Sequence, residues 1–406
     1  MSGGGERIVI VGAGHAGGSA AAFLRQFEFT GEIVLIGAEP LAPYQRPPLS
    51  KAWLKGEADA DSLLLKGPDF YAEANIDLRL ATRVTHLDRA ERQVVLSDGG
   101  RLNYDRLVLA TGSSALKLPI PGAPDPRVLE LRDAADAQRL KSALSPGARL
   151  VVIGAGYVGL EVAASARALG CSVTVIERQP RVLARVASAP LSAAFEARHR
   201  REGVEILTCA AVTAIEAGRR VRLEGGASIE GDAVLVGVGA AACEDLAREA
   251  GLACEGGVIT DAWGRTSDPN VFAVGDCARR PVELAGASLR LESVPNALET
   301  ARRCAAALTG RPLPQAEVPW FWSDQYDLKL QIAGVLNAPD ATVVRGSLVD
   351  ERFAVFSLSG GRIQAVEAVN APAEFMAGRQ LIARNTRVSA HVLQDPSLTA
   401  RDLARI

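Results

Sequence analysis

The sequence predicts an α/β protein in which one supersecondary unit occurs twice and a smaller α+β region follows. Residues 7–18, RIVIVGAGHAGG, recur in outline at residues 149–160 as RLVVIGAGYVGL. Each copy is an apolar run, a G-x-G-x-x-G turn and an alanine-rich helical stretch, closed by a second apolar run. The copies stand much farther apart than the period of a solenoid repeat, so we interpret them as two separate domains of related architecture.

Composition excludes several classes of protein. The 406 residues are 48% hydrophobic, and 45 basic and 47 acidic residues leave a formal net charge of −2. A nucleic-acid-binding protein normally carries a basic excess, and a membrane span needs about 18 or more apolar residues, which no stretch approaches. The six cysteines are scattered without C-x-x-C spacing, which argues against a metal site, a disulfide framework and a redox-active dithiol. We therefore expect a soluble cytoplasmic protein that begins with a short tail, MSGGG, and holds no metal.

Hydrophobic periodicity and turn residues place the elements in chain order. The expected helices span 16–26, 157–169, 293–309 and 373–385, the third with Pro295 in its first turn. The expected strands span 32–37, 93–96, 106–110, 172–177, 233–238, 329–335, 342–348 and 353–358, with a hairpin-like stretch over 218–231. The aromatic cluster WFWSDQYDLKL, after Pro319, marks the start of the α+β region.

The two glycine motifs have the context of a dinucleotide-binding site, since each follows a strand and opens a helix. The first glycine permits the tight turn, the second lets the backbone approach a pyrophosphate, and the third allows the helix to pack closely on the strand. These residues are Gly12, Gly14 and Gly17 in the first copy and Gly154, Gly156 and Gly159 in the second. A diphosphate is then expected against the N–H groups at each helix N-terminus.

Acidic residues at the end of the second strand of each copy bear on the choice of dinucleotide. Glu177 can accept hydrogen bonds from the ribose hydroxyls of an adenosine and repel a 2′-phosphate, which favours NAD over NADP. Arg178 follows directly and leaves a phosphate-binding alternative open. In the first copy the strand ends Ile36-Gly37-Ala38-Glu39, so Glu39 is the candidate and Ala38 an unusual neighbour.

Two dinucleotide sites in one chain suggest a bound flavin and a diffusing nicotinamide, and six further motifs carry a family resemblance. They are YQRPPLSKAWL (44–54), YDRLVLATGSS (104–114), GYVGLEVAA (156–164), TSDPNVFAVGDCA (266–278), ESVPNALETAR (292–302) and PWFWSDQYD (319–327). With these motifs the chain resembles the flavoproteins with two dinucleotide-binding domains, and among them the FAD-dependent ferredoxin reductases of bacterial oxygenase systems. The resemblance covers nearly the whole chain.

The resemblance implies a glutathione-reductase-like architecture with two Rossmann-like domains. The FAD-binding domain is expected over 1–116 and 243–315, the NAD-binding domain over 117–242, and the C-terminal α+β domain over 316–406. FAD is expected to bind tightly without a covalent link, and NADH to act as co-substrate.

Individual site residues are implied by the same resemblance. Thr111 and Gly112 close over the FAD, Asp276 bonds its ribityl chain, and Lys51 lies near the flavin ring. Other positions that match FAD contacts of the family are Ala16, Val84, Arg132, Val294 and Trp322. One member of the family has an aspartate where this chain has Ala38, so the adenosine contact there falls to Ala38 or Glu39. On the NAD side the residues are Tyr157 and Glu161, and Glu161 is expected to pair with Lys51 across the stacked nicotinamide and flavin.

The implied function is hydride transfer from NADH to FAD, then single-electron transfer to a [2Fe–2S] ferredoxin that supplies an oxygenase, with a cytochrome P-450 monooxygenase favoured. Because such ferredoxins are acidic, docking is expected near Arg302, Arg303 and Arg311, in the segment of residues 279–311, which holds six arginines against three glutamates. The alternatives are the reductase of a Rieske dioxygenase, a rubredoxin reductase, an NADH oxidase and a redox signalling protein like apoptosis-inducing factor. A peroxidase form is disfavoured because no cysteine precedes Cys171.

Overall fold

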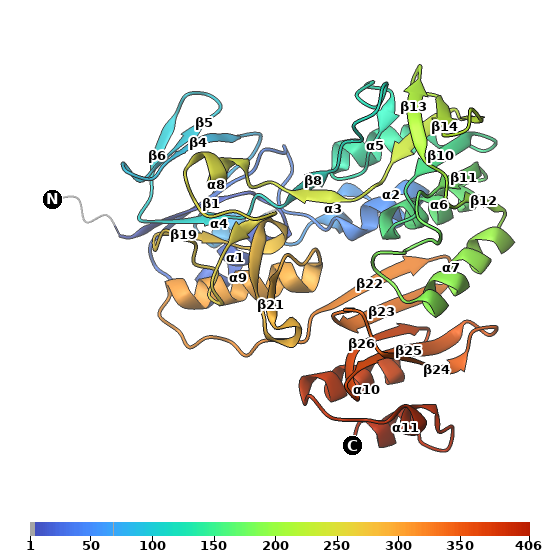
Figure 1. Ribbon diagram of the computed structural model, residues 1–406. Coiled ribbons are helices and arrows are strands. Elements are labelled where there is room, and N and C mark those ends of the chain that lie inside the picture. Colours follow the sequence, from blue (N-terminus) through green and yellow to red (C-terminus); the bar gives the residue numbers. More distant parts are fainter. Residues whose placement is uncertain (1–4, 68) are drawn as a thin grey trace. The chain divides into compact units, whose positions relative to one another are not determined.

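The structure is a computed structural model that describes residues 5–67 and 69–406. Most of the expected N-terminal tail therefore lies outside the described residues. The chain forms two compact units, which are described separately (Figure 1). Of the described residues, unit 1 contains 5–45, 60–67, 69–114 and 241–317, and unit 2 contains 46–59, 115–240 and 318–406. The chain passes between the units before and after residues 46–59, through the short strands β8 (Ser113–Ala115) and β17 (Ala240–Ala242), and between residues 317 and 318.

Unit 1 is built on a five-stranded parallel sheet with strand order β19-β7-β1-β2-β3. Side chains alternate across β1, so Ile8 and Ile10 face one core and Val9 and Val11 the other. The helices α1 and α9 cover the first face, and the second is covered by β4, β5 and α8. Burial on both faces explains why these strands are continuous apolar runs. The sheet strands are β1 (Arg7–Val11), β2 (Glu32–Ile36), β3 (Ile76–Arg79), β7 (Arg106–Leu109) and β19 (Val271–Ala273).

Smaller elements complete unit 1. A second sheet is the antiparallel meander of β4 (Val84–Asp88), β5 (Gln93–Leu96) and β6 (Arg101–Asn103), and a third contains β18 (Val258–Ile259), β20 (Ala278–Val282) and β21 (Ala287–Leu289). The helices are α1 (His15–Gln26), α3 (Ala60–Leu63), α4 (Phe70–Glu73), α8 (Asp245–Glu249) and α9 (Val294–Leu308), with 3₁₀ turns η2 (Gly275–Cys277) and η3 (Glu283–Ala285). Pro295 lies in the first turn of α9, where its missing N–H costs no hydrogen bond, as expected.

Unit 2 repeats the parallel plan with strand order β12-β11-β10-β16-β9. The helices α5, α6 and α7 cover one face of this sheet, and the β13-β14-β15 meander covers the other. The parallel strands are β9 (Val128–Leu129), β10 (Arg149–Ile153), β11 (Ser172–Ile176), β12 (Val204–Leu207) and β16 (Ala233–Val236). The meander is β13 (Val212–Glu216), β14 (Arg220–Leu223) and β15 (Ser228–Glu230), and the helices are η1 (Pro47–Ser50), α2 (Ala52–Lys55), α5 (Ala134–Ala143), α6 (Tyr157–Ala168) and α7 (Ala189–Arg201).

The C-terminal part of unit 2 is an antiparallel sheet with strand order β22-β23-β26-β25-β24. One face packs under α10, α11 and α12, and the other joins the core of α6 and α7 through residues such as Leu330 and Val355. Since both faces of this sheet are buried, the C-terminal region forms one compact unit with residues 115–240. The elements are β22 (Trp320–Gln325), β23 (Leu328–Gly334), β24 (Ala341–Ser347), β25 (Arg352–Ser359), β26 (Arg362–Val369), α10 (Pro372–Ala383), α11 (Ala390–Gln394) and α12 (Ala400–Leu403).

The α/β class and its two glycine-loop units are confirmed. Two strands of the C-terminal sheet, β22 and β26, were not among the expected elements. The division into three domains stays a prediction. It assigns residues 46–59 to the FAD-binding domain, whereas the contacts of these residues place them in unit 2, where η1 and α2 pack on α5 and α6.

Candidate functional site

The first glycine loop has the geometry expected of a pyrophosphate cradle. Gly12 has φ +113°, and a Cβ there would lie 2.2 Å from the Ala110 carbonyl oxygen, so only glycine fits the turn. A Cβ at Gly17 would lie 1.8 Å from the Gly12 oxygen, which is the close helix–strand contact. A Cβ at Gly14 would meet no described atom within 4 Å. The backbone at Gly14, the N-cap of α1, therefore leaves free space in front of a positively polarised helix end.

The second glycine loop has the same pattern inside unit 2. Gly154 has φ +106°, and a Cβ there would lie 2.4 Å from the Gly237 oxygen. A Cβ at Gly159 would lie 2.3 Å from the Gly154 oxygen, whereas one at Gly156 would meet no described atom within 4 Å. Tyr157, the first residue of α6, packs against Phe321 with ring centroids 4.7 Å apart. Both loops thus combine two crowded glycines with one open glycine, and the residues present fit a dinucleotide diphosphate at each.

In unit 1 the expected flavin residues gather at the carboxyl ends of neighbouring parallel strands. Gly12 follows β1, Thr111 and Gly112 follow β7, and Asp276 follows β19, and these three strands are adjacent in the sheet. The Ser113 hydroxyl donates a hydrogen bond of 3.0 Å to the Asp276 carboxylate. This edge is where ligands bind in open parallel sheets, because the loops that follow the strands leave a crevice there.

Further contacts hold this edge together. The Thr111 hydroxyl donates to the Cys243 carbonyl at 2.6 Å. A Cβ at Gly275 would lie 2.7 Å from the Ala16 Cβ, so α1 and the turn before Asp276 are in close contact. Val294 is the first residue of α9, the helix that packs along α1.

Three other predicted flavin positions of unit 1 are Ala38 and Glu39, which follow β2 next to β1, and Val84. Val84 begins β4 and pairs with Leu96 in the antiparallel meander. Ala38 is exposed and has only a methyl group to offer, whereas the Glu39 carboxylate accepts a hydrogen bond of 2.5 Å from the Tyr44 hydroxyl. Of the two residues, Glu39 alone has a side chain that can bond a ribose hydroxyl.

The corresponding acid of unit 2, Glu177, is fixed by the backbone around it. It accepts a hydrogen bond of 2.8 Å from the Ala155 N–H of the glycine loop and one of 2.7 Å from the Gln179 N–H. Each bond uses a different carboxylate oxygen, and a carboxylate has about four lone-pair sites, so acceptor capacity remains on each. The adjacent Arg178 is exposed. Glu177 therefore places a negative charge beside the open glycine loop.

Lys51 and Glu161 form a close ion pair in unit 2. The Lys51 Nζ lies 2.6 Å from the Glu161 Oε2, and their side chains are 18% and 6% exposed. Lys51 also donates a hydrogen bond of 3.1 Å to the Pro47 carbonyl. Lys51 stands between η1 and α2, and Glu161 stands on α6 directly after the glycine loop. The pairing expected between these residues is present, although their role in hydride transfer stays a prediction.

Two serines that the sequence analysis did not identify bind the same carboxylate. Ser50 donates to the Glu161 Oε2 at 2.5 Å, and Ser323 donates to its Oε1 at 2.7 Å. Ser50 precedes Lys51 in the PPLSK motif, so its place in that motif was a usable signal. Ser323 lies on β22, and only the tertiary fold brings it to α6.

The remaining predicted residues of unit 2 are Arg132 and Trp322. The Arg132 N–H donates a hydrogen bond of 3.0 Å to the Asp136 carboxylate at the start of α5, and its carbonyl accepts one from the Arg46 guanidinium. Trp322 lies on β22, with its ring centroid 5.5 Å from that of Trp320.

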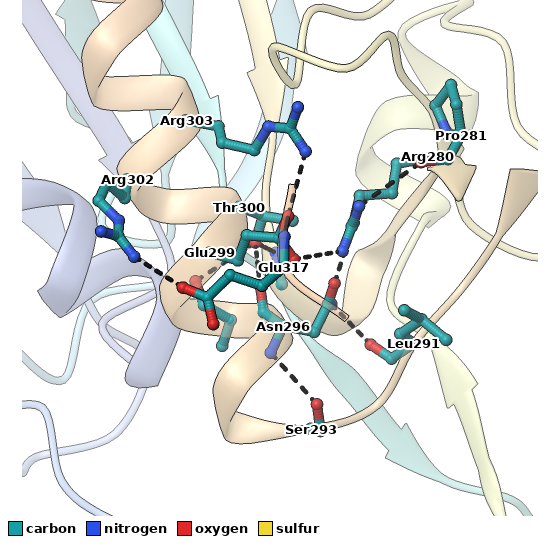
Figure 2. A network of polar contacts seen from close by, with 12 residues as sticks. Arg280, Pro281, Leu291, Ser293, Asn296, Glu299, Thr300, Arg302, Arg303 and Glu317 are labelled. Atoms are coloured by element: carbon teal, nitrogen blue, oxygen red, sulfur yellow. Dashed lines mark hydrogen bonds and ion pairs between the residues drawn. The ribbon is translucent and has the colours of Figure 1, made fainter. Parts of the chain in front are cut away.

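The structure corrects one of the three arginines expected on a docking surface. Arg303 is only 7% exposed, and its guanidinium lies 3.1 Å from Glu299, one turn earlier on α9. Glu299 also pairs with the buried Arg280 at 2.7 Å (Figure 2). A buried guanidinium paired within the fold cannot meet a protein partner, so charge counting along the segment misplaced Arg303.

The other two arginines are accessible. Arg302 is 44% exposed and pairs with Glu317 at 2.9 Å (Figure 2). Arg311 is 42% exposed and pairs with Glu28 at 2.9 Å. Exposed ion pairs of this kind are weak, so both guanidiniums can exchange their partners for another carboxylate.

The cysteines bear on whether the protein uses thiol chemistry, and the helices bear on whether it has a membrane span. All six cysteines lie in the described part of the chain and all are free, with Cys171, Cys277 and Cys304 buried. Burial raises the pKa of the Cys277 thiol, which opposes thiolate chemistry next to Asp276. Within residues 5–67 and 69–406, no helix has both the length and the apolar character that a membrane span requires.

Comparison with known proteins agrees with this architecture. The family model for pyridine nucleotide-disulphide oxidoreductases matches residues 6–301, and the model for the reductase C-terminal domain matches residues 320–404. The probable ferredoxin reductase CtmF of Castellaniella defragrans is 46% identical over 404 residues, covering 98% of this chain and 99% of the relative. Putidaredoxin reductase CamA of Pseudomonas putida is 42% identical over 407 residues, covering 98% and 96%. The structure of the covalent putidaredoxin reductase–putidaredoxin complex matches with a TM-score of 0.96 at 42% identity, covering 99% of both chains.

Proposed function

Because this chain belongs to the pyridine nucleotide-disulphide oxidoreductase family and, within it, to the ferredoxin reductases, we propose that it is an NADH:ferredoxin oxidoreductase. It moves the two electrons of a hydride from NADH to a tightly bound FAD and delivers them singly to a [2Fe–2S] ferredoxin. The observation that carries this proposal is the presence of one open glycine loop in each compact unit, which supports separate sites for a resident and a diffusing dinucleotide.

The chain's own residues bind and orient. FAD, when bound, supplies the chemistry that accepts a hydride and releases electrons one at a time. The backbone at Gly14 holds its diphosphate, and Asp276 bonds its ribityl hydroxyls while Ser113 keeps that carboxylate in place. The backbone at Gly156 holds the diphosphate of NADH. Lys51 is the cation proposed to stabilise the negative charge that FAD would gain on reduction, and Glu161 orients its ammonium within unit 2.

Glu177 is proposed to select NADH over NADPH. The Ala155 N–H of the glycine loop donates a hydrogen bond to its carboxylate, and this bond holds the Glu177 side chain in one orientation beside the loop. A 2′-phosphate at that place would meet a fixed negative charge. The exposed Arg178 next to it would instead favour a 2′-phosphate, and the ratio of NADH to NADPH activity measures which of the two charges prevails.

We propose that electrons leave without a sulfur relay, because no two of the six cysteines stand in the C-x-x-C spacing of a redox-active dithiol. The proposed acceptor is a small acidic ferredoxin, and Arg302 and Arg311 are the accessible arginines proposed to meet it. Such pairing acts mainly on the association rate and is screened by salt. The exposed Cys209, which is also unpaired, supports a reducing compartment, and we place the protein in the cytoplasm.

A stopped-flow experiment tests the function. The enzyme is reduced with NADH without oxygen and mixed either with [2Fe–2S] ferredoxins or with aerated buffer. We expect fast, saturable reoxidation by a ferredoxin and slow reoxidation by oxygen. Fast oxidation by oxygen together with no reaction with any ferredoxin would identify an NADH oxidase and overturn the proposal.

The ferredoxin identified in this way can then be used to test which class of oxygenase finally receives the electrons. We propose a cytochrome P-450 monooxygenase, with a Rieske dioxygenase as the alternative that the family resemblance leaves open. Reconstitution of NADH-driven substrate oxidation with each class of oxygenase separates them, since only the physiological class should turn over at a ferredoxin-limited rate.

A further inference from the structure

A chain of buried hydrogen bonds ends on the carboxylate of Glu161. The Tyr326 hydroxyl lies 3.1 Å from the His199 Nδ1, and the His199 Nε2 lies 2.8 Å from the Gln325 Oε1. The Gln325 Nε2 donates to the Ser323 Oγ at 3.2 Å, and Ser323 donates to the Glu161 Oε1 at 2.7 Å. All five residues belong to unit 2, and they come from α6, α7, β22 and the turn after β22.

The Glu161 carboxylate determines which atom donates and which accepts in each of these hydrogen bonds. An ionised carboxylate only accepts, so the Ser323 hydroxyl must donate to Glu161 and accept from the Gln325 amide. The Gln325 oxygen is then an acceptor, which requires the hydrogen of His199 to be on Nε2. The Nδ1 of His199 is left to accept from the Tyr326 hydroxyl. All donors therefore point toward Glu161, and one tautomer of His199 satisfies the whole chain.

The hydrogen-bonded residues are shielded from water along most of this network. Ser323 and His199 are 0% exposed, Gln325 is 1% exposed and Glu161 is 5% exposed. Burial is the main reason that the pKa of His199 is lowered, to about 4, and the neighbouring Arg198 lowers it as well, against Gln325 and Glu202, which raise it. His199 is therefore neutral near pH 7, as the donor direction requires. In such surroundings aligned hydrogen bonds polarise and strengthen one another.

The other carboxylate oxygen of Glu161 carries the functional ion pair. Its Oε2 accepts from Ser50 and faces the Lys51 ammonium at 2.6 Å. Ser50 is itself held, because its carbonyl accepts a hydrogen bond of 2.7 Å from Ser165 on α6. The orientation of the carboxylate therefore decides where the ammonium sits, and the chain through Ser323 holds the opposite oxygen.

We propose that Ser323, Gln325, His199 and Tyr326 are positioning residues that hold the Glu161 carboxylate, and through it the Lys51 ammonium, in the geometry required for hydride transfer. The inference rests on the proposed function, because it concerns the step in which NADH reduces the flavin. An amide in the middle of the chain does not readily pass a proton, so the role is orientation rather than proton transport.

A matched pair of serines separates this role from ordinary packing. Ser323 and Ser357 are both 0% exposed and both lie on strands of the C-terminal sheet, but the Ser357 hydroxyl has no hydrogen-bond partner among the described residues. Ser323→Ala removes the last link to Glu161, Ser323→Thr restores a hydroxyl, and Ser357→Ala is the control for removing a buried hydroxyl from the same sheet.

The experiment measures reduction of bound FAD by NADH and by 4-deuterated NADH in a stopped-flow instrument. For Ser323→Ala we expect the saturating rate constant to fall about tenfold or more, the effect of losing a hydrogen bond to a charged group. The NADH concentration at half-saturation should change less than about twofold, because binding is not the step affected. Ser323→Thr should recover most of the rate, and Ser357→Ala should match the wild type.

A double-mutant cycle with Lys51 tests the route of the effect. If Ser323 acts through Lys51, Ser323→Ala should slow a Lys51→Ala enzyme much less than it slows the wild type. Equal slowing in both backgrounds would overturn the inference, as would a wild-type rate constant in Ser323→Ala with full FAD content.

Gln325→Met provides the same tests should Ser323→Ala fail to retain FAD. A wild-type rate constant in that variant, or equal slowing in the Lys51→Ala background, would again overturn the inference. Absence of NADH-dependent flavin reduction in the wild type itself would instead refute the proposed function.

Discussion

Acid destabilisation through His199 follows directly from its buried position. Burial first, and the charge of Arg198 after it, lower the pKa of this imidazole from 6.5 to about 4, against Gln325 and Glu202. Between these two pH values the unfolded chain carries a proton on His199 that the folded chain does not. The contribution of neutral His199 to the free energy of unfolding is therefore fully present above about pH 6.5, and it is lost as the pH falls toward 4.

The size of the effect follows from the two pKa values. From about pH 7 to about pH 5 the unequal protonation lowers the free energy of unfolding by about 2 kcal/mol. Carboxylates elsewhere in the chain also respond to acid, so the useful quantity is a difference between variants. His199→Gln keeps an amide that can donate to Gln325 and removes the titrating ring, so its stability should be less sensitive to acid by about that amount.

The assay is urea unfolding of the FAD-loaded protein at both pH values, followed by far-ultraviolet circular dichroism. His391→Gln is the control, because it replaces an exposed histidine of the same unit and should leave the acid sensitivity unchanged. The reasoning is refuted if wild type and His199→Gln lose the same free energy of unfolding between the two conditions.

Four further predictions concern the proposed site. Gly14→Val should fold but purify without FAD, since its side chain would enter the open space before α1; a stoichiometric yellow protein would contradict this. Glu177→Gln should narrow the preference for NADH over NADPH in steady-state kinetics by removing a fixed charge, and an unchanged ratio of kcat/KM values would place selection elsewhere. Lys51→Ala should retain FAD but reduce it at least about tenfold more slowly, and wild-type speed would remove Lys51 from the mechanism. Arg302→Glu should raise the ferredoxin KM and weaken its salt dependence while NADH-to-ferricyanide activity is retained; identical ferredoxin kinetics would place docking away from Arg302.

The sequence alone determined the parts of this protein that depend on local geometry. The crowded positions Gly12 and Gly154 have φ values that favour glycine, and the spacing of the glycines placed both helix N-termini. The buried parallel strands were legible as apolar runs because both of their faces are covered. The PPLSK and GYVGLEVAA motifs also indicated that Lys51 and Glu161 belong together, although only by resemblance to a family.

Only the tertiary structure decided which side chains surround those residues. Ser50 and Ser323 are 111 and 162 positions from Glu161 in the chain, and no periodicity within a single element connects such positions. Arg303 shows the same limit in reverse, because counting charges along residues 279–311 cannot distinguish a guanidinium that pairs with Glu299 in the core from one that faces water. Hydrogen bonds and burial depend on which distant segments pack against an element, and that is settled by the fold of the whole unit rather than by the residues next in sequence.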